Sequence, residues 1–227
     1  MYTKIFKRGL DIFFALLALI VLIPIWIPVC IILLLTGEHA VFYFQRRIGY
    51  KNRPFSIWKH ATMLKDSERL PGGVYTVRND PRVLPFGRSL RKTKINEIPQ
   101  LMNILKGDMS FVGPRPLVER TFNLYPPQVQ ETIYNVLPGL TGIGSVIFRD
   151  EEKLLSHSNT SPEEFYKHHI APYKGALELW YQQNLSLITD IKIIFLTAWV
   201  IFFPSSKLPY RWFKNLPPRP TFLDQHH

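Results

Sequence analysis

The longest apolar segment of the chain lies near its start and predicts a helix that enters a membrane. The run Leu10–Leu35 is apolar apart from Asp11. As a helix it would be about 39 Å long, enough to cross a hydrocarbon core of about 30 Å. Pro24 and Pro28 lie inside the run, and each removes a backbone donor, so we expect the helix to break there.

Basic residues flank this run on both sides, and positive flanks favour the cytoplasmic face. They are Lys4, Lys7 and Arg8 before the run, and Arg46, Arg47, Lys51 and Arg53 after it. We therefore predict a re-entrant helix that enters, bends and returns to the same side. A simple spanning helix would place one basic flank on the wrong side. A signal peptide fits poorly because its apolar region is shorter and no A-x-A site follows the run.

Two further apolar patterns predict the remaining membrane contacts and a small sheet. Within Leu185–Phe203, the eleven residues Ile193–Phe203 carry no charge, and cations and Trp212 follow. This stretch is too short to span, so it predicts an interfacial helix, with a buried core helix as the alternative. The short runs Val41–Phe44 and Phe55–Trp58 enclose a turn-rich segment and predict a β-hairpin.

The stretch Arg91–Pro116 gathers acidic, basic and turn-forming residues. Apolar residues recur there at helical spacing (Ile98, Leu101, Met102 and Leu105). The spacing predicts a short amphipathic helix with Asn96 and Glu97 in its first turn, ended by Lys106-Gly107. Arg115 follows between two prolines, which fix the backbone on both sides.

This arrangement favours a diphosphate site. Arginine offers a planar fork of donors to phosphate oxygens, a helix start has free N–H groups, and a carboxylate such as Glu97 can hold Mg²⁺. The alternative is an ordinary surface loop, with Glu97 only complementing the helix dipole.

Composition limits the partners without choosing among them. The formal net charge is +11 and the isoelectric point is near 9.8. Such a charge implies an acidic partner, which could be a nucleic acid, an anionic lipid or a phosphorylated substrate. Cys30 is the single cysteine, so no intrachain disulfide can form. His226 and His227 at the end are typical of a tag remnant.

Three segments of the chain resemble the bacterial sugar transferase family, the monotopic phosphoglycosyl transferases. They are FSIWKHATM (55–63), RKTKINEIPQLMNILKGDMSFVGPRP (91–116) and PGLTG (138–142). The resemblance implies transfer of a sugar 1-phosphate from a UDP-sugar to polyprenyl (undecaprenyl) phosphate, with Mg²⁺ and release of UMP. This step initiates a capsule, O-antigen, exopolysaccharide or glycoprotein. It also implies a re-entrant helix at the cytoplasmic face of the bacterial inner membrane.

The sequence departs from the family pattern at one position that matters for the mechanism. The family's central helix opens with an Asp-Glu pair whose Asp attacks the β-phosphate, whereas this chain has Asn96-Glu97. An amide cannot supply that nucleophile. Glu97 could attack instead, polyprenyl phosphate could attack directly, or the site could be impaired. The segment after PGLTG, which contains Arg149, also differs from the commoner version and leaves the sugar open.

We therefore expect a mostly helical α+β monotopic membrane protein with a small β-hairpin, a re-entrant helix and interfacial amphipathic helices. Its expected parts are a membrane segment (1–36), a cytosolic catalytic domain (37–184) and an interfacial tail (185–227). No nucleic-acid-binding module is recognisable, so phospholipid is the expected third partner, and the oligomeric state stays open. The expected catalytic residues are Glu97, Asn96 and Lys59, the substrate-binding residues are Arg91, Arg115, Arg88 and Arg149, and Glu97 is the expected metal ligand.

Overall fold

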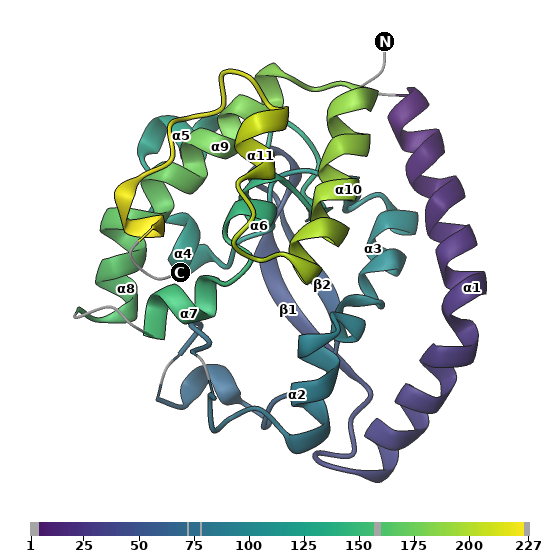
Figure 1. Ribbon diagram of the computed structural model, residues 1–227. Coiled ribbons are helices and arrows are strands. Elements are labelled where there is room, and N and C mark those ends of the chain that lie inside the picture. Colours follow the sequence, from purple (N-terminus) through teal and green to yellow (C-terminus); the bar gives the residue numbers. More distant parts are fainter. Residues whose placement is uncertain (1–4, 72, 78, 157–159, 225–227) are drawn as a thin grey trace.

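The computed structural model describes residues 5–71, 73–77, 79–156 and 160–224, so the terminal histidine pair lies outside the described residues. The protein is mostly helical, as predicted, and the helices surround two small sheets (Figure 1). The longer helices are α1 (Lys7–Leu35), α2 (Pro85–Lys92), α3 (Gln100–Lys106), α9 (Ala171–Gln183) and α10 (Leu187–Phe202). The shorter ones are α4 (Glu119–Phe122), α5 (Pro127–Thr132), α6 (Ile143–Ile147), α7 (Glu151–Ser156), α8 (Pro162–Phe165) and α11 (Leu208–Trp212).

The predicted β-hairpin is confirmed. Strand β1 (Phe42–Ile48) pairs antiparallel with β2 (Pro54–His60). The turn between them contains Lys51 and Asn52, both with left-handed backbone, at φ of 52° and 56°. A second sheet was not predicted: β3 (Ser110–Val112) and β4 (Gly139–Thr141) pair in parallel. Their six residues are too few to show a periodicity in the sequence.

Helix α1 runs unbroken through both prolines, so the predicted break at Pro24 and Pro28 is wrong. Each proline removes only one backbone donor. Beyond them, Val29 and Leu33 pack against Leu90 and hold the last turns of the helix in place. Figure 1 shows α1 as one coil that curves along the side of the molecule. By length and composition the helix could cross a membrane.

Polar contacts fix the start of α1 on the folded domain. Lys7 forms a largely buried ion pair with Asp190 of α10. The guanidinium of Arg8 donates to the carbonyl oxygens of Ile104, at 2.5 Å, and Leu105, at 2.9 Å, and so caps the end of α3. Because Leu33 also packs on the domain, both ends of α1 lie against the same body.

Helix α10 has two faces, and its buried face confirms the alternative of a core helix for this segment. Ile193 and Leu196 are fully buried in the main core, together with residues from α5, α6 and α9. Ile191 and Phe202 are on the opposite side, 56% and 77% exposed. The helix is thus both a core element and the carrier of an exposed apolar surface.

Candidate active site

The predicted central helix is split, and the split decides where Glu97 lies. Residues Ile95–Glu97 form a separate 3₁₀ turn, and α3 begins only at Gln100. The prediction that Asn96 and Glu97 lie in the first turn of this helix is therefore wrong. Lys94 adopts a left-handed backbone with φ of 62°, which redirects the chain between α2 and this turn. The predicted end of the helix is confirmed, since Gly107 caps α3 with φ of 94°.

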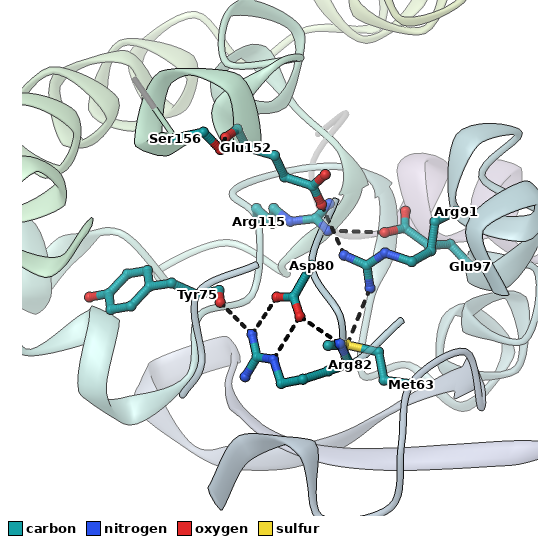
Figure 2. Close-up of polar contacts among 9 residues, drawn as sticks. All are labelled: Met63, Tyr75, Asp80, Arg82, Arg91, Glu97, Arg115, Glu152 and Ser156. Carbon is teal, nitrogen blue, oxygen red and sulfur yellow. Dashed lines mark hydrogen bonds and ion pairs between the residues drawn. The ribbon is translucent and has the colours of Figure 1, made fainter. Parts of the chain in front are cut away.

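Glu97 forms an ion pair with Arg115 at the centre of the site. The guanidinium of Arg115 donates to Glu97 Oε1 at 3.0 Å, and Figure 2 shows the two side chains pointing toward each other. Burial by itself would raise the pKa of Glu97. The positive charges of Arg115, Lys59 and Lys94 outweigh burial and lower this pKa to about 2. Glu97 is therefore a carboxylate at neutral pH.

The cations around Glu97 repel one another. Burial lowers the pKa of Lys59, on β2, well below its usual value, and the neighbouring Arg47 adds to the effect. Burial, together with the charge of Arg115, also lowers the pKa of Arg47 to about 10. Several positive charges thus converge on a single carboxylate, which leaves an excess of positive charge that an anionic ligand would neutralise.

The loop that carries Arg115 is held by its backbone. The hydroxyl of Tyr134 donates to the carbonyl oxygen of Arg115 at 2.9 Å, and the N–H of Gly139 donates to the carbonyl of Pro114 at 2.9 Å. A Cβ on Gly139 would lie 2.1 Å from the nitrogen of Gly113, so only glycine permits this close approach. The second sheet therefore serves to position the arginine.

Arg91 and Arg149 lie at the edge of this cluster, and Arg88 does not join it. Arg91, on α2, donates to Glu152 of α7 at 2.9 Å, and its charge contributes to the lowered pKa of Lys59 (Figure 2). Arg149 forms an ion pair with the neighbouring Asp150 and contributes to the lowered pKa of Lys94. Arg88 is exposed on α2, and no ion pair connects it to the cluster within the described parts of the chain.

Asn96 is buried beside this cluster with an unused polar atom. It is 5% exposed, and its Oδ1 has no hydrogen-bond partner among the described residues. A buried polar atom left without a partner costs roughly 1–3 kcal/mol. The described residues contain no group of three or more His, Cys, Asp and Glu side chains that could hold a metal by themselves.

Three titratable residues of the site region were not predicted from the sequence. Arg47 and Lys94 were noted only as part of basic segments, and Glu178 carried no signal because it lies within an ordinary helical pattern. Glu178, on α9, is 1% exposed, and burial raises its pKa to about 8. Its Oε1 would lie 2.3 Å from a Cβ on Gly144, so the carboxyl group fills the space that this glycine leaves.

Comparison with known proteins finds relatives whose similarity covers most of the chain. An exopolysaccharide production protein ExoY from Sinorhizobium fredii is 32% identical over 205 residues, which cover 84% of this chain and 83% of the relative. An undecaprenyl-phosphate glucose phosphotransferase from Komagataeibacter xylinus is 34% identical over 84% of this chain, but only 35% of the relative's length is matched. A UDP-N-acetylgalactosamine-undecaprenyl-phosphate N-acetylgalactosaminephosphotransferase from Aeromonas hydrophila is 32% identical over 84% of this chain and 42% of its own length.

The family described as "Bacterial sugar transferase" matches residues 2–204. This range includes the 3₁₀ turn of Glu97, the loop of Arg115 and strand β2 with Lys59. The chain therefore belongs to the bacterial sugar transferase family and is a transferase.

Proposed function

We propose that the protein transfers a sugar 1-phosphate from a UDP-sugar to undecaprenyl phosphate, giving a polyprenyl diphosphate sugar and UMP. The observation that carries this proposal is the partly buried carboxylate of Glu97 surrounded by the cations of Lys59, Lys94 and Arg115. A diphosphate and a phosphate monoester both bring the negative charge that this cluster needs. The names of the relatives from Komagataeibacter xylinus and Aeromonas hydrophila support an undecaprenyl phosphate acceptor, and the latter name supports a UDP-sugar donor.

The proposed reaction is a direct displacement at the β-phosphorus. An oxygen of undecaprenyl phosphate forms a bond to this phosphorus, the bond to the bridging oxygen breaks, and UMP leaves with the electron pair. The amide side chain of Asn96 lacks the carboxylate that a nucleophilic attack on this phosphorus would require. A carboxylate whose pKa is about 2, already bonded to Arg115, is a weak nucleophile, so Glu97 has the role of holding the cations in place. Arg115, Lys59 and Arg91 stabilise the charge that develops on the transferring group.

The residues of the site fit a Mg²⁺ ion that would be bound jointly by protein oxygens and by the phosphates of the substrate. Mg²⁺ is commonly held by one or two carboxylates together with substrate phosphates. Glu97 would supply the carboxylate, and the buried Oδ1 of Asn96, which has no partner among the described residues, would supply a neutral oxygen. When bound, the ion would offset the negative charge of the phosphates.

The exposed apolar surface supports attachment to one face of a membrane. Most large apolar side chains of α1 are exposed, including Ile20, 66%, and Val21, 64%. Monomeric soluble proteins rarely expose so large a continuous apolar patch. Because both ends of the unbroken helix α1 contact the same domain, we propose that it lies along one face of the membrane as a monotopic anchor, without the predicted re-entrant bend. The basic flanks favour the cytoplasmic face of the inner membrane.

Release of UMP by the detergent-solubilised full chain tests the reaction. Protein, Mg²⁺ and a panel of UDP-sugars would be incubated with and without undecaprenyl phosphate. Direct transfer predicts UMP only when the acceptor is present, and loss of at least about 100-fold in rate for Glu97→Gln. The matched control is Glu131→Gln, which removes an exposed carboxylate and should keep the parent rate.

Other outcomes separate the alternatives. A stoichiometric burst of UMP without acceptor that disappears in Glu97→Gln would show that Glu97 is the nucleophile after all. If no sugar supports turnover but Asn96→Asp restores it, the natural chain is an impaired member of the family. If no UDP-sugar supports turnover by either the parent or the Asn96→Asp variant, the proposed UDP-sugar donor is refuted.

A further inference from the structure

An open groove lies between α10 and α11, outside the candidate active site. Its volume is about 610 Å³. Figure 1 shows α11 beside α10, with α1 on the other side of α10. The groove is lined by Ile188, Ile191, Lys192, Phe195, Arg211 and Trp212.

The apolar part of the groove is open to the surroundings. Ile188 is 66% exposed, Ile191 is 56% exposed and Phe195 is 47% exposed. The rings of Phe195 and Trp212 stack, with centroids 5.1 Å apart and planes inclined by 24°. This contact joins α10 to α11 and gives the groove a flat aromatic wall, which suits a hydrocarbon chain.

The polar part of the groove is purely cationic. Lys192 and Arg211 are its charged lining residues, and no acidic side chain lines it. Lys192 lies over the ring of Phe213, with its ammonium nitrogen 5.8 Å from the ring centroid. Within the ranges that the structure describes, neither cation has an ion-pair partner. A ligand that satisfies both parts is an amphiphile with an anionic head group.

The groove opens on the exposed apolar side of α10, and we place this side in the membrane together with α1. The outer side of α10 continues from Ile191 to Phe202, which is 77% exposed, and α1 is joined to α10 through the Lys7–Asp190 ion pair. A soluble anion would leave the apolar wall of the groove exposed to water. A lipid that is already in the membrane reaches the groove without leaving the apolar phase.

We propose that this groove binds an anionic phospholipid, with its phosphate held by Lys192 and Arg211 and an acyl chain against Ile188, Phe195 and Trp212. The proposal rests on the membrane attachment proposed above, and it adds a specific head-group site to that attachment. It implies that α10 and α11 bind anionic phospholipids in preference to neutral ones.

Quenching of Trp212 fluorescence tests the site. The full-length protein would be placed in phosphatidylcholine nanodiscs that contain brominated phosphatidylglycerol or, at equal mole fraction, brominated phosphatidylcholine. The signal of Trp212 is obtained by subtracting that of Trp212→Phe. Two cations near a lipid head group should enrich the anionic lipid about 10-fold or more, so brominated phosphatidylglycerol should quench Trp212 more strongly.

A charge-matched pair of variants makes the test specific. Lys192→Gln with Arg211→Gln should abolish the preference, whereas Arg53→Gln with Lys167→Gln, which removes two exposed cations elsewhere, should retain it. Native mass spectrometry of the released protein gives a second readout that does not depend on Trp212. It should detect phosphatidylglycerol adducts with the parent and with the control pair only.

Two results overturn different parts of the proposal. Equal quenching by both lipids in the parent, or an unchanged preference in the Lys192 and Arg211 variant, would refute the head-group site. Flotation with phosphatidylcholine vesicles separates this failure from a failure of membrane attachment. A protein that floats but shows no lipid preference is attached without this site, and one that does not float lacks the proposed anchor.

Discussion

The substitution Glu178→Gln should make the stability of the protein less sensitive to alkaline pH. The carboxyl group of Glu178 is 1% exposed and faces Lys174 and the backbone of Arg115 and Gly144. Lys174 is itself paired with Glu151 at 2.5 Å. Burial raises the pKa of Glu178 from 4.5 to about 8, against the opposing charge of Lys174. The folded protein therefore keeps a proton on Glu178 at neutral pH.

The direction and size of the effect follow from proton linkage. In the unfolded chain the carboxyl group titrates near 4.5, so between this pH and about 8 the folded state binds a proton that the unfolded state has released. The stability contribution of Glu178 is complete below 4.5 and is lost as the pH rises through about 8. Between about pH 5 and about pH 8, the free energy of unfolding should fall by about 3.5 kcal/mol because of Glu178. For a chain of this size that corresponds to about 7–14 °C in Tm.

Thermal unfolding of the full chain in a mild detergent, followed by far-ultraviolet circular dichroism across this pH range, would measure the effect. Lys59 titrates with the opposite sign, because its pKa is lowered by burial, so the prediction concerns the difference between parent and variant. Glu178→Gln should lose the alkaline decline in Tm that Glu178 causes, whereas Glu131→Gln, at an exposed position, should keep it. An identical pH slope in parent and Glu178→Gln would refute the protonated carboxyl group.

Two further substitutions test the packing on which the site depends. Gly144→Ala would bring a Cβ within 2.3 Å of Glu178 Oε1 and should lower the free energy of unfolding by about 1–3 kcal/mol. The control Gly9→Ala, with no atom within 4 Å of the new Cβ, should not destabilise the protein. Equal Tm values for the two variants would contradict the close contact at Gly144. Asp190→Asn would leave the largely buried ammonium group of Lys7 without its charge partner and should cost about 3–5 kcal/mol by the same unfolding measurement. A loss below about 1 kcal/mol would indicate an ion pair that contributes no more than a surface pair does.

The active-site region shows how far local sequence patterns reach. The motif around Glu97 and Arg115 could be recognised because its charges and prolines are close together in the chain. Arg47 could not be assigned to the same site, since strand pairing and the loop of Arg115 bring it there from a distant part of the sequence. Glu178 was not predicted for a related reason. An acidic residue in a helix is expected to be exposed to solvent unless the neighbouring element is known to bury it.

The sequence by itself determined the elements whose signals are local. The apolar run of α1, the short apolar runs of the hairpin, the glycine cap of α3 and the family motif all depend on neighbours a few residues apart. Only the tertiary structure decided the continuity of α1 through its prolines, because Val29 and Leu33 receive their packing partner Leu90 from α2. It also decided the charge state of the site. A pKa depends on burial and on charges brought together through space, and these distances are fixed only when the chain folds.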